Sequence, residues 1–360
     1  MMKKGTKIAL LVAAMLILCG GLISGLGMLA ERDRRGEAPV MEFTEESREI
    51  SDKFTRIALD TGMYDVTLER ASDGVGRVVY LESKKLSCTI SVKNGVLLIE
   101  EQDKRGVMDQ FNFFTSPALT IYLPETAFDS LHVESTTGDL EVPAAFSFGD
   151  LSYEGDTGDV SVMAEIADSL ELSTDTGMIT VADVTVGRME IETDTGDISL
   201  RKLTVQDEVE ISGDTCGVRM EDVTARTLEL ELSTGDVYCD GLNVEHKLDM
   251  ESSTGHKELS SVRCYNLVLS ATTGKTVLQD VVAEGSAVLT ADTGDIELEG
   301  FDAAEIGIVT STGDVSGWFL SDKVIFAESD TGDIDIAESL SGGKCRVTTD
   351  TGDISLQIGK

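Results

Sequence analysis

Apolar and polar residues alternate along most of this chain, and the alternation itself repeats every 19 or 20 residues. From residue 134 onward, two runs of alternating residues flank a turn motif, Asp/Ser-Thr-Gly-Asp-Ile/Val. The glycines of this motif are Gly138, Gly158, Gly177, Gly196, Gly217, Gly235, Gly255, Gly274, Gly294, Gly313, Gly332 and Gly352. The longest interval between them, from Gly196 to Gly217, is explained by one inserted residue, Cys216, and the next interval is correspondingly short. So constant a period is typical of a solenoid, in which each coil stacks on its neighbour.

Each repeat predicts two half-buried strands. The second and fourth positions after the glycine are apolar, as at Ile198 and Leu200, and so are the seventh and fifth positions before it, as at Met189 and Ile191. Alternation of this kind indicates a strand with one face inward. A looser apolar position marks a further corner or short strand, at Val184, Val223, Val262, Phe301 and Leu340. We therefore predict an all-β fold, a β-solenoid with stacked coils of about 19–20 residues over residues 134–360.

The distribution of proline supports this fold. All four prolines, Pro39, Pro117, Pro124 and Pro143, lie in the first part of the chain, and the later repeats contain none. Proline lacks the amide hydrogen that a strand donates to its neighbour, so it is excluded from strands paired on both sides.

Residues 50–133 predict a β-rich cap on the N-terminal end of the solenoid. Asn94-Gly95 stands between alternating apolar residues, which is a strong signal for a two-residue hairpin turn. Asp60-Thr61-Gly62-Met63 is similar to an early copy of the repeat turn. Residues 118–123 fall one period before Gly138, and we expect them to form the first full strand of the stack.

The N-terminal segment 8–30 is uncharged and long enough to cross a bilayer as a helix. We predict an uncleaved transmembrane signal anchor there, a cytoplasmic N-terminus at 1–7 and a linker at 31–49. The expected location is the cell membrane, with a single pass and the C-terminal region extracellular. A cleaved signal peptide and a lipoprotein anchor at Cys19 are the alternatives. Met28-Leu29-Ala30 is a poor cleavage site, and Leu18 stands where a lipoprotein has a small residue.

Charge and cysteine content exclude several functions. Lys and Arg total 29 against 66 Asp and Glu, a net charge of −37, which disfavours nucleic acid as a partner. Six cysteines are present, but none forms a CxxC motif or pairs with histidine at metal spacing. Cys88, Cys216, Cys239, Cys264 and Cys345 are therefore expected to be small core residues.

The aspartate after each turn glycine forms a column that is the one candidate for a cofactor site. Four consecutive coils keep it, at Asp295, Asp314, Asp333 and Asp353. Met178, Val218, His256 and Lys275 interrupt it elsewhere. Carboxylates one coil apart, about 4.8 Å, repel by roughly 1 kcal/mol in water. Either turn amides donate to each carboxylate, which is our main interpretation, or Ca²⁺ lies between them.

Catalysis is the alternative from another functional class, since some β-helices cleave polysaccharides. Such an enzyme needs a cleft with carboxylates and an aromatic track, whereas Tyr238 and Trp318 form no track. His132, His246 and His256 fall at unrelated positions of the repeat. We predict no catalytic residue and no enzyme.

The motifs resemble a known group. The strand leading into the first turn, Leu131 to Asp139, and Thr-Ile-Tyr-Leu-Pro at 120–124 resemble the putative adhesin family, a bacterial domain-of-unknown-function group. The resemblance covers about residues 50–360. It implies a membrane-anchored surface β-solenoid with an adhesin-like, structural or envelope-stress role, and no defined functional residues. The ligand on the envelope or cell surface is not named by the sequence.

Self-association is a second expectation. Lys360 follows Gly352 by eight residues, with no evident C-terminal cap. An uncovered strand edge can pair with another copy of the chain.

Overall fold

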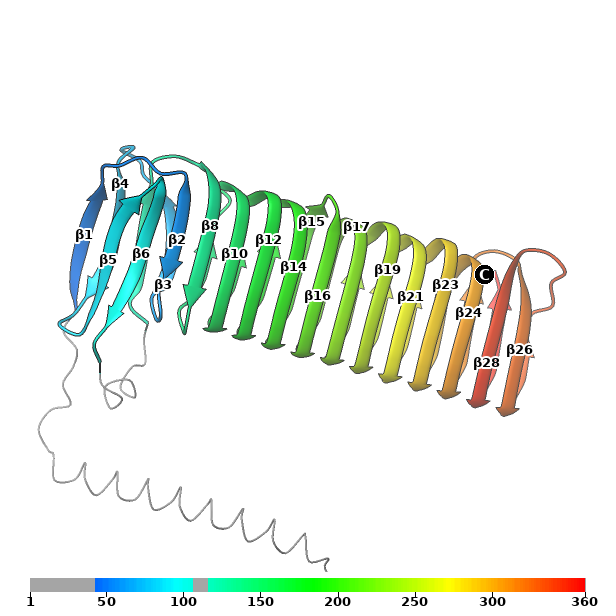
Figure 1. Ribbon diagram of the computed structural model, residues 1–360. Coiled ribbons are helices and arrows are strands. Elements are labelled where there is room, and N and C mark those ends of the chain that lie inside the picture. Colours follow the sequence, from blue (N-terminus) through cyan, green and yellow to red (C-terminus); the bar gives the residue numbers. More distant parts are fainter. Residues whose placement is uncertain (1–42, 106–115, 360) are drawn as a thin grey trace, which may run out of the picture. The chain divides into compact units, whose positions relative to one another are not determined.

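Parallel pairing between successive repeats builds most of the structure (Figure 1). The computed structural model describes residues 43–105 and 116–359, and every helix or strand within these ranges is a β-strand. All described pairings lie within Thr44–Lys360, one compact unit that contains its own hydrogen-bond ladder and apolar core. The predicted all-β solenoid is confirmed.

Two groups of strands make up this unit. The first group is β1 (Thr44–Ile50), β2 (Arg56–Asp60), β3 (Asp65–Arg70), β4 (Gly76–Glu82), β5 (Leu86–Lys93), β6 (Val96–Asp103) and β7 (Ala118–Leu123). The regular repeats follow as β8 (Ala127–Ser135), β9 (Leu140–Val142), β10 (Ser147–Thr157), β11 (Val160–Val162), β12 (Glu165–Thr176), β13 (Ile179–Ala182), β14 (Thr185–Thr195), β15 (Ile198–Val205), β16 (Glu208–Thr215), β17 (Val218–Thr234), β18 (Val237–Asp240), β19 (Asn243–Thr254), β20 (Lys257–Ser260), β21 (Arg263–Thr273), β22 (Thr276–Gln279), β23 (Val282–Thr293), β24 (Ile296–Thr312), β25 (Val315–Phe319), β26 (Lys323–Thr331), β27 (Ile334–Ile336), β28 (Gly343–Thr351) and β29 (Ile354–Ile358).

Each coil has a leading strand, which ends at the Thr-Gly turn, and a trailing strand, which begins just after it. In β17 and β24 the trailing strand of one coil continues without interruption into the leading strand of the next. Leading strands pair in parallel register, so equivalent residues stack. One inward column consists of Leu170, Met189, Val209, Leu228, Leu248 and Leu267, all almost fully buried. The alternation read from the sequence therefore places the core correctly.

In seven coils the chain turns a second corner six residues after the turn glycine, or after Cys216 where that residue takes its place. The residues there adopt a left-handed backbone with φ of 52–74°: Asp183, Lys202, Asp222, Gly241, Ser261, Asp280 and Gly300. The next residue is buried, as predicted for Val184, Val223, Val262 and Phe301. Leu340 was predicted to be equivalent, which is wrong, because its side chain is fully exposed.

Cys216 is not an inserted residue. Its N–H donates to the Thr234 carbonyl at 3.0 Å, as the turn glycine Gly235 donates to Thr254 at 2.9 Å. Cys216 therefore occupies the glycine position, and Gly217 occupies the aspartate position. The coil has its regular length, and Gly217, not Val218, interrupts the aspartate column.

At the N-terminal end, the order of coils in space differs from their order in sequence. β2 lies between β6 and β8, and β3 lies between β7 and β9. The carbonyl of Gly62 accepts the N–H groups of Thr136 and Thr137, so the early copy of the turn is part of the stack. The solenoid thus begins with β2, before the predicted boundary at 134. Residues 118–123 form a strand, but β7 pairs with β3 and is not the strand directly below the Gly138 coil.

Antiparallel strands close this end. β4 pairs with β7, β1 with β4, and β5 with β6 through the predicted Asn94-Gly95 hairpin. Because β1 starts at Thr44, the predicted linker 31–49 is wrong in its last residues, which already form a strand. Residues 1–7 and the predicted transmembrane segment 8–30 lie outside the described residues. Within 43–105 and 116–359, no helix is long and apolar enough to span a membrane.

The C-terminal end shows a second exchange of order. β28 pairs with both β24 and β26, and β29 pairs with both β25 and β27. The last coil in the sequence, β28 and β29, therefore lies in space between the coil of β24 and β25 and the coil of β26 and β27. Buried Lys323, which donates to the Asp302 carboxylate and to Ser321 Oγ at 2.6 Å, fastens the start of β26. The end of the stack is β26 and β27, whose outer edges have no strand partner among the described residues.

Candidate functional site

The four candidate metal ligands are joined to one another through the backbone. Asp295 Oδ1 accepts the N–H of Asp314 at 3.0 Å, and Asp314 Oδ1 accepts the N–H of Asp353 at 2.8 Å. Asp353 Oδ1 in turn accepts the N–H of Asp333 at 2.8 Å. Their order in space is thus 295, 314, 353 and 333, not the order expected from the sequence. Each bond fastens one coil to the next, which supports the amide-acceptor interpretation.

The hydrogen bond from one coil to the next persists where another residue replaces aspartate at this turn position. His256 donates its backbone N–H to Asp236 Oδ1 at 2.8 Å, and its ring Nδ1 lies 3.1 Å from the N–H of Lys275. The imidazole therefore replaces the carboxylate as acceptor. Glu297, which forms an ion pair with the Lys275 ammonium, raises the pKa of that lysine. The column is a structural ladder that tolerates more than one acceptor.

No metal centre is assembled by the parts of the chain that the structure describes. Within residues 43–105 and 116–359, no group of three or more His, Cys, Asp and Glu side chains lies close enough to hold an ion. The Ca²⁺ hypothesis for the aspartate column stays a prediction.

A different set of carboxylates is concentrated on the outward side of the leading strands, and we call it the acidic face. It consists of Glu154, Glu171, Glu190, Glu192, Glu210, Glu229, Glu231, Asp249 and Glu251, on β10, β12, β14, β16, β17 and β19. Five of these residues are in-register neighbours across five successive strands: Glu171, Glu190, Glu210, Glu229 and Asp249. Neighbouring members are about one strand spacing apart, roughly 4.8 Å, so their negative potentials add.

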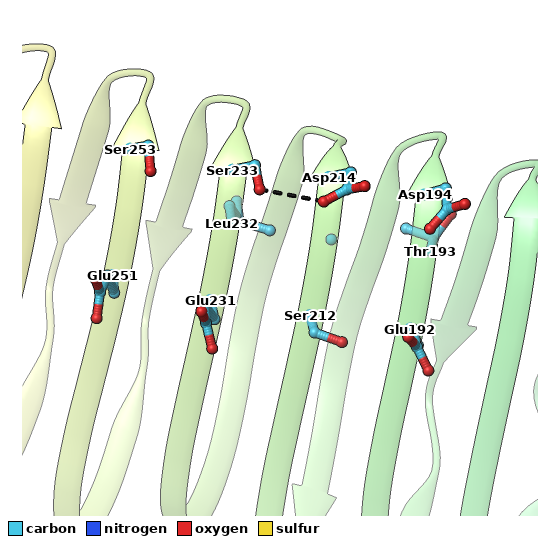
Figure 2. A pocket seen from close by; sticks show the side chains of 11 residues that line it. Glu192, Thr193, Asp194, Ser212, Asp214, Glu231, Leu232, Ser233, Glu251 and Ser253 are labelled. Atoms are coloured by element: carbon cyan, nitrogen blue, oxygen red, sulfur yellow. Dashed lines mark hydrogen bonds between the residues drawn. The ribbon is translucent and has the colours of Figure 1, made fainter.

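Shallow troughs run along this face. Figure 2 shows Glu192, Ser212, Glu231 and Glu251 in one row and a second row, with Asp194 and Asp214, nearer the turns. The trough between these rows encloses about 350 Å³. Ser233 Oγ donates to Asp214 Oδ1 at 3.1 Å, from one coil to the adjacent coil. Two further troughs continue toward the N-terminal end, one of them lined by His132, Glu154, Glu171 and Glu190.

Few cations neutralise the acidic face. The Arg188 guanidinium lies 3.1 Å from Glu210, 3.8 Å from Glu208 and 3.9 Å from Glu190. Lys247 Nζ lies 2.5 Å from Asp249. Nine carboxylates thus face two basic side chains, and the surface is open to positively charged groups.

The face changes character at β21. The equivalent outward positions on β21, β23 and β24 are uncharged, with Val268, Val288 and Val309 among them. Val288 is 44% exposed and Val309 51%. The continuous acidic face therefore ends at β19.

Lys257 is the most unusual side chain of the core. It occupies the second position after Gly255, where most other coils have Ile or Val, and it stacks between Val237 and Thr276. Its ammonium donates to Ser252 Oγ, and both side chains are 1% exposed. Burial lowers the pKa of Lys257 to about 8. Since both groups are sealed inside the coil, we assign the pair to the core.

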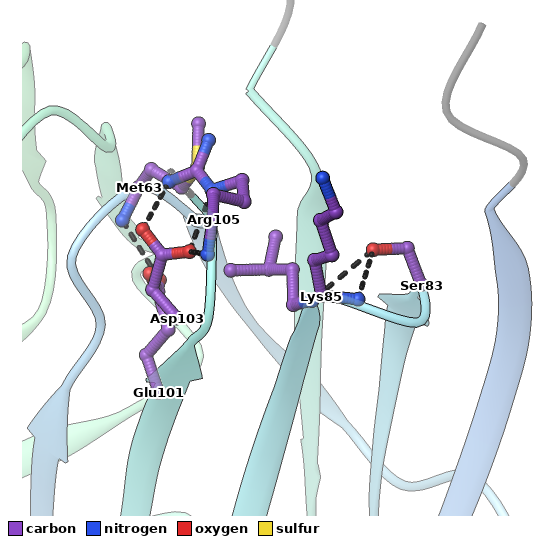
Figure 3. A network of polar contacts seen from close by, with 7 residues as sticks. Met63, Ser83, Lys85, Glu101, Asp103 and Arg105 are labelled. Atoms are coloured by element: carbon purple, nitrogen blue, oxygen red, sulfur yellow. Dashed lines mark hydrogen bonds and ion pairs between the residues drawn. The ribbon is translucent and has the colours of Figure 1, made fainter. Parts of the chain in front are cut away.

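The cap contains a polar network at the ends of its hairpins (Figure 3). Glu101 accepts the N–H of Met63 at 2.9 Å, and Asp103 pairs with Arg105 at 2.7 Å. Burial raises the pKa of Glu101, and it raises the pKa of the Cys88 thiol to about 12. A thiol with so high a pKa is protonated at neutral pH and is a poor nucleophile. The network fixes the cap and offers no reactive group.

The remaining predicted features are scattered. His132 bonds to Ser152 at 2.7 Å on the outward side of β8, His246 lies near the start of β19, and His256 lies in the aspartate ladder. Tyr238 is 40% exposed, and Trp318 is half-buried near Gly300. Cys216, Cys239, Cys264 and Cys345 are buried core residues, as predicted. The structure brings no predicted pair of these groups together.

The acidic face and Lys257 were not singled out from the sequence. Their signal exists, because aligning the repeats on the turn position, with Cys216 in place of glycine, shows Glu or Asp at one outward position in five successive coils. The same alignment shows Lys257 at an inward position that is apolar in the other coils except at Thr276.

Comparison with solved structures finds several proteins to which the chain is similar. A putative adhesin from Bacteroides fragilis is similar, with 11% identity, 89% of this chain and 98% of that one covered, and a TM-score of 0.31. A putative adhesin from Parabacteroides merdae shares 13% identity over 77% of this chain and 96% of its own, with a TM-score of 0.32. A putative lipid binding protein from Parabacteroides distasonis shares 15% identity over 76% and 94%, with a TM-score of 0.28. No curated protein matches the chain.

These similarities carry no functional conclusion, and the envelope-stress role and the cell-surface location stay predictions. The family model Toastrack DUF4097 matches residues 54–255 and 246–360, which confirms the resemblance to the putative adhesin solenoids. The chain belongs to the Toastrack DUF4097 family.

Proposed function

We propose that this chain is a non-enzymatic, adhesin-like binding module at the cell surface, anchored through residues 8–30. Its acidic face binds an extended cationic polypeptide segment. One observation carries the proposal, namely the unbroken register of Glu171, Glu190, Glu210, Glu229 and Asp249.

The face suits such a ligand in shape and in charge. Parallel strands fixed by ladders on both sides hold the backbone positions of the carboxylates at a constant spacing, so little backbone freedom is lost when a ligand binds. The troughs between the rows are open along the stack and can accept a chain laid across the strands. Lysine and arginine side chains of an extended segment can reach several carboxylates in turn, and the attraction also speeds encounter.

Titration of the segment 43–360 with a lysine oligomer tests the proposal, with the fully acetylated oligomer as the uncharged probe. We expect binding that weakens as salt rises, because exposed charges are screened. Replacing Glu190, Glu210 and Glu229 with Gln is expected to weaken binding about tenfold, since three exposed ion pairs contribute roughly 0.5 kcal/mol each.

A matched variant removes three carboxylates from the trailing strands: Asp240→Asn, Glu258→Gln and Glu299→Gln. It changes the net charge equally, and we expect it to keep the affinity within about twofold. If both variants lose affinity equally, the lysine oligomer recognises overall charge and the acidic face is not the binding site.

A further inference from the structure

At the exposed end of the solenoid, apolar side chains are left without a covering coil. Ile334 stands at the second position after its turn glycine, and its side chain is 44% exposed. Ile354, at the same position one coil inward, is 0% exposed. Leu320 and Phe326 are 47% and 54% exposed, and Leu340 is fully exposed. These apolar side chains, in the segment 320–342, belong to the coil that ends the stack.

The backbone at this end is also open. β26 pairs only with β28 and β27 only with β29 among the described strands, so two strands present free N–H and C=O groups on one side. Free strand edges beside exposed apolar residues favour strand addition. The opposite end differs in its side chains: β1 and β5 also pair on one side only among the described strands, but the apolar residues Val78, Tyr80 and Leu86 are buried there.

We propose that this end binds the same end of a second copy of the chain, forming a two-fold symmetric dimer in which β26 pairs antiparallel with its counterpart. The site is independent of the acidic face and goes beyond the proposed ligand binding.

A second copy fits this end better than any other occupant. An occupant must present a free strand edge together with apolar side chains, and the end coil itself presents both. The two-fold arrangement uses one surface twice and closes, because the capped ends then point away from each other. The segment 320–342 has about the number of residues that one partner contributes to a standard interface, roughly 20–30.

The charges of the end coil give the dimer a distinctive response to salt. Glu328, Asp330, Asp333 and Asp335 lie on β26, β27 and the turn between them, and they approach their counterparts across the interface. Screening reduces this repulsion, so dimerisation strengthens as salt rises. Binding of a cationic ligand to the acidic face responds in the opposite direction.

Sedimentation equilibrium of the segment 43–360, from low micromolar to several hundred micromolar, tests the inference. We expect a monomer–dimer equilibrium that shifts toward dimer between about 50 mM and about 500 mM salt. Ile334→Lys places a charge in the interface and is expected to reduce the association constant at least tenfold. Val288→Lys is the matched control, because Val288 is equally exposed at 44% and lies outside the end coil.

Several results would overturn the proposal: a monomer at every concentration and salt, a mass that grows beyond two copies, or equal losses in both variants. Circular dichroism and thermal melting establish that the variants fold, and Phe326→Lys replaces Ile334→Lys if the latter does not. Binding of the lysine oligomer is expected to be unchanged by Ile334→Lys, so failure of dimerisation and failure of ligand binding are distinguishable.

Discussion

At Gly274, a Cβ atom would lie 2.0 Å from the carbonyl oxygen of Gly255 in the adjacent coil. The φ angle at Gly274 is +137°, a conformation that side chains rarely allow. The turn glycine is therefore required twice, by its own backbone and by the close approach of the next turn. The first reason is local to the turn, and only the stack reveals the second.

Gly274→Ala is expected to destabilise the protein by about 3 kcal/mol or more, because the coils must move apart to admit the methyl group. Gly307→Ala is the matched control, since no atom lies within 4 Å of its Cβ position. We expect that variant to stay within about 0.5 kcal/mol of the parent. Urea unfolding followed by circular dichroism measures both, and equal effects would contradict the steric explanation.

Lys257 links stability to pH. Its pKa is about 8 in the folded chain, below the ordinary value of 10.5, because burial disfavours the charged form. Between these two values the unfolded chain binds a proton that the folded chain has released. Stability therefore rises with pH across this window, and below about pH 8 the full cost of a buried charge is present.

Lys257→Met is expected to stabilise the protein at pH 7 by about 2 kcal/mol. The pKa difference of 2.5 corresponds to about 3 kcal/mol, and loss of the bond to Ser252 costs about 1 kcal/mol. The advantage should shrink as pH rises from 8 to 10. Urea midpoints at several pH values measure it, with exposed Lys247→Met as the control. An advantage that is constant with pH would show that no charge is buried at this position.

At the scale of the strand and turn, the aspartate ladder supplements the sheet ladder. Strand pairing satisfies the backbone groups of the leading and trailing strands, but N–H groups in the turns between them need other acceptors. The carboxylate of one coil accepts the amide of the next, as Asp295 does for Asp314. A hydrogen bond to a charged acceptor contributes about 1.5–3 kcal/mol, which exceeds the repulsion of roughly 1 kcal/mol between neighbouring carboxylates in water.

Substitutions of Asp314 distinguish its role as a hydrogen-bond acceptor from the effect of its negative charge. Asp314→Asn keeps an oxygen for the Asp353 amide and is expected to leave the urea midpoint unchanged or slightly raised. Asp314→Ala removes the acceptor and is expected to cost about 1 kcal/mol. Addition of Ca²⁺ should shift the parent and Asp314→Asn equally. A stabilisation by Ca²⁺ that only the parent shows would instead support a cation between the carboxylates.

At the scale of the whole molecule, the coil was predictable and the order of coils was not. Inward positions are apolar in nearly every repeat, with Lys257 and Thr276 among the exceptions, so spacing alone predicts the strands, the turns and the core. The same uniformity makes each coil a suitable neighbour for any other. Nothing in the pattern distinguishes a coil at 323–336 that follows β24 from one that follows β28, and the exchange at each end was missed for this reason.

The candidate sites were less predictable than the fold. Outward positions do not contribute to the core, so their residues differ from one repeat to the next. Because the whole chain is rich in Asp and Glu, the acidic face does not stand out in the sequence. The aspartate column was visible because it belongs to the turn motif. The positions of Cys216 and Gly217 in the turn were misread, because the repeats were aligned on their glycines. In the structure Cys216 takes the glycine position, which keeps the regular spacing between coils.

The inserted position of the last coil also determines how the molecule resists unravelling. β29 is held between β25 and β27, and β28 between β24 and β26. A pulling force transmitted through the residues after Ile358 must break two ladders at once, whereas a strand at the end of a stack built in chain order would peel from a single neighbour. The outermost coil is tethered to the rest of the chain at both of its ends. When it frays it opens as a closed loop that gains little entropy, and it gives an exopeptidase no free tail.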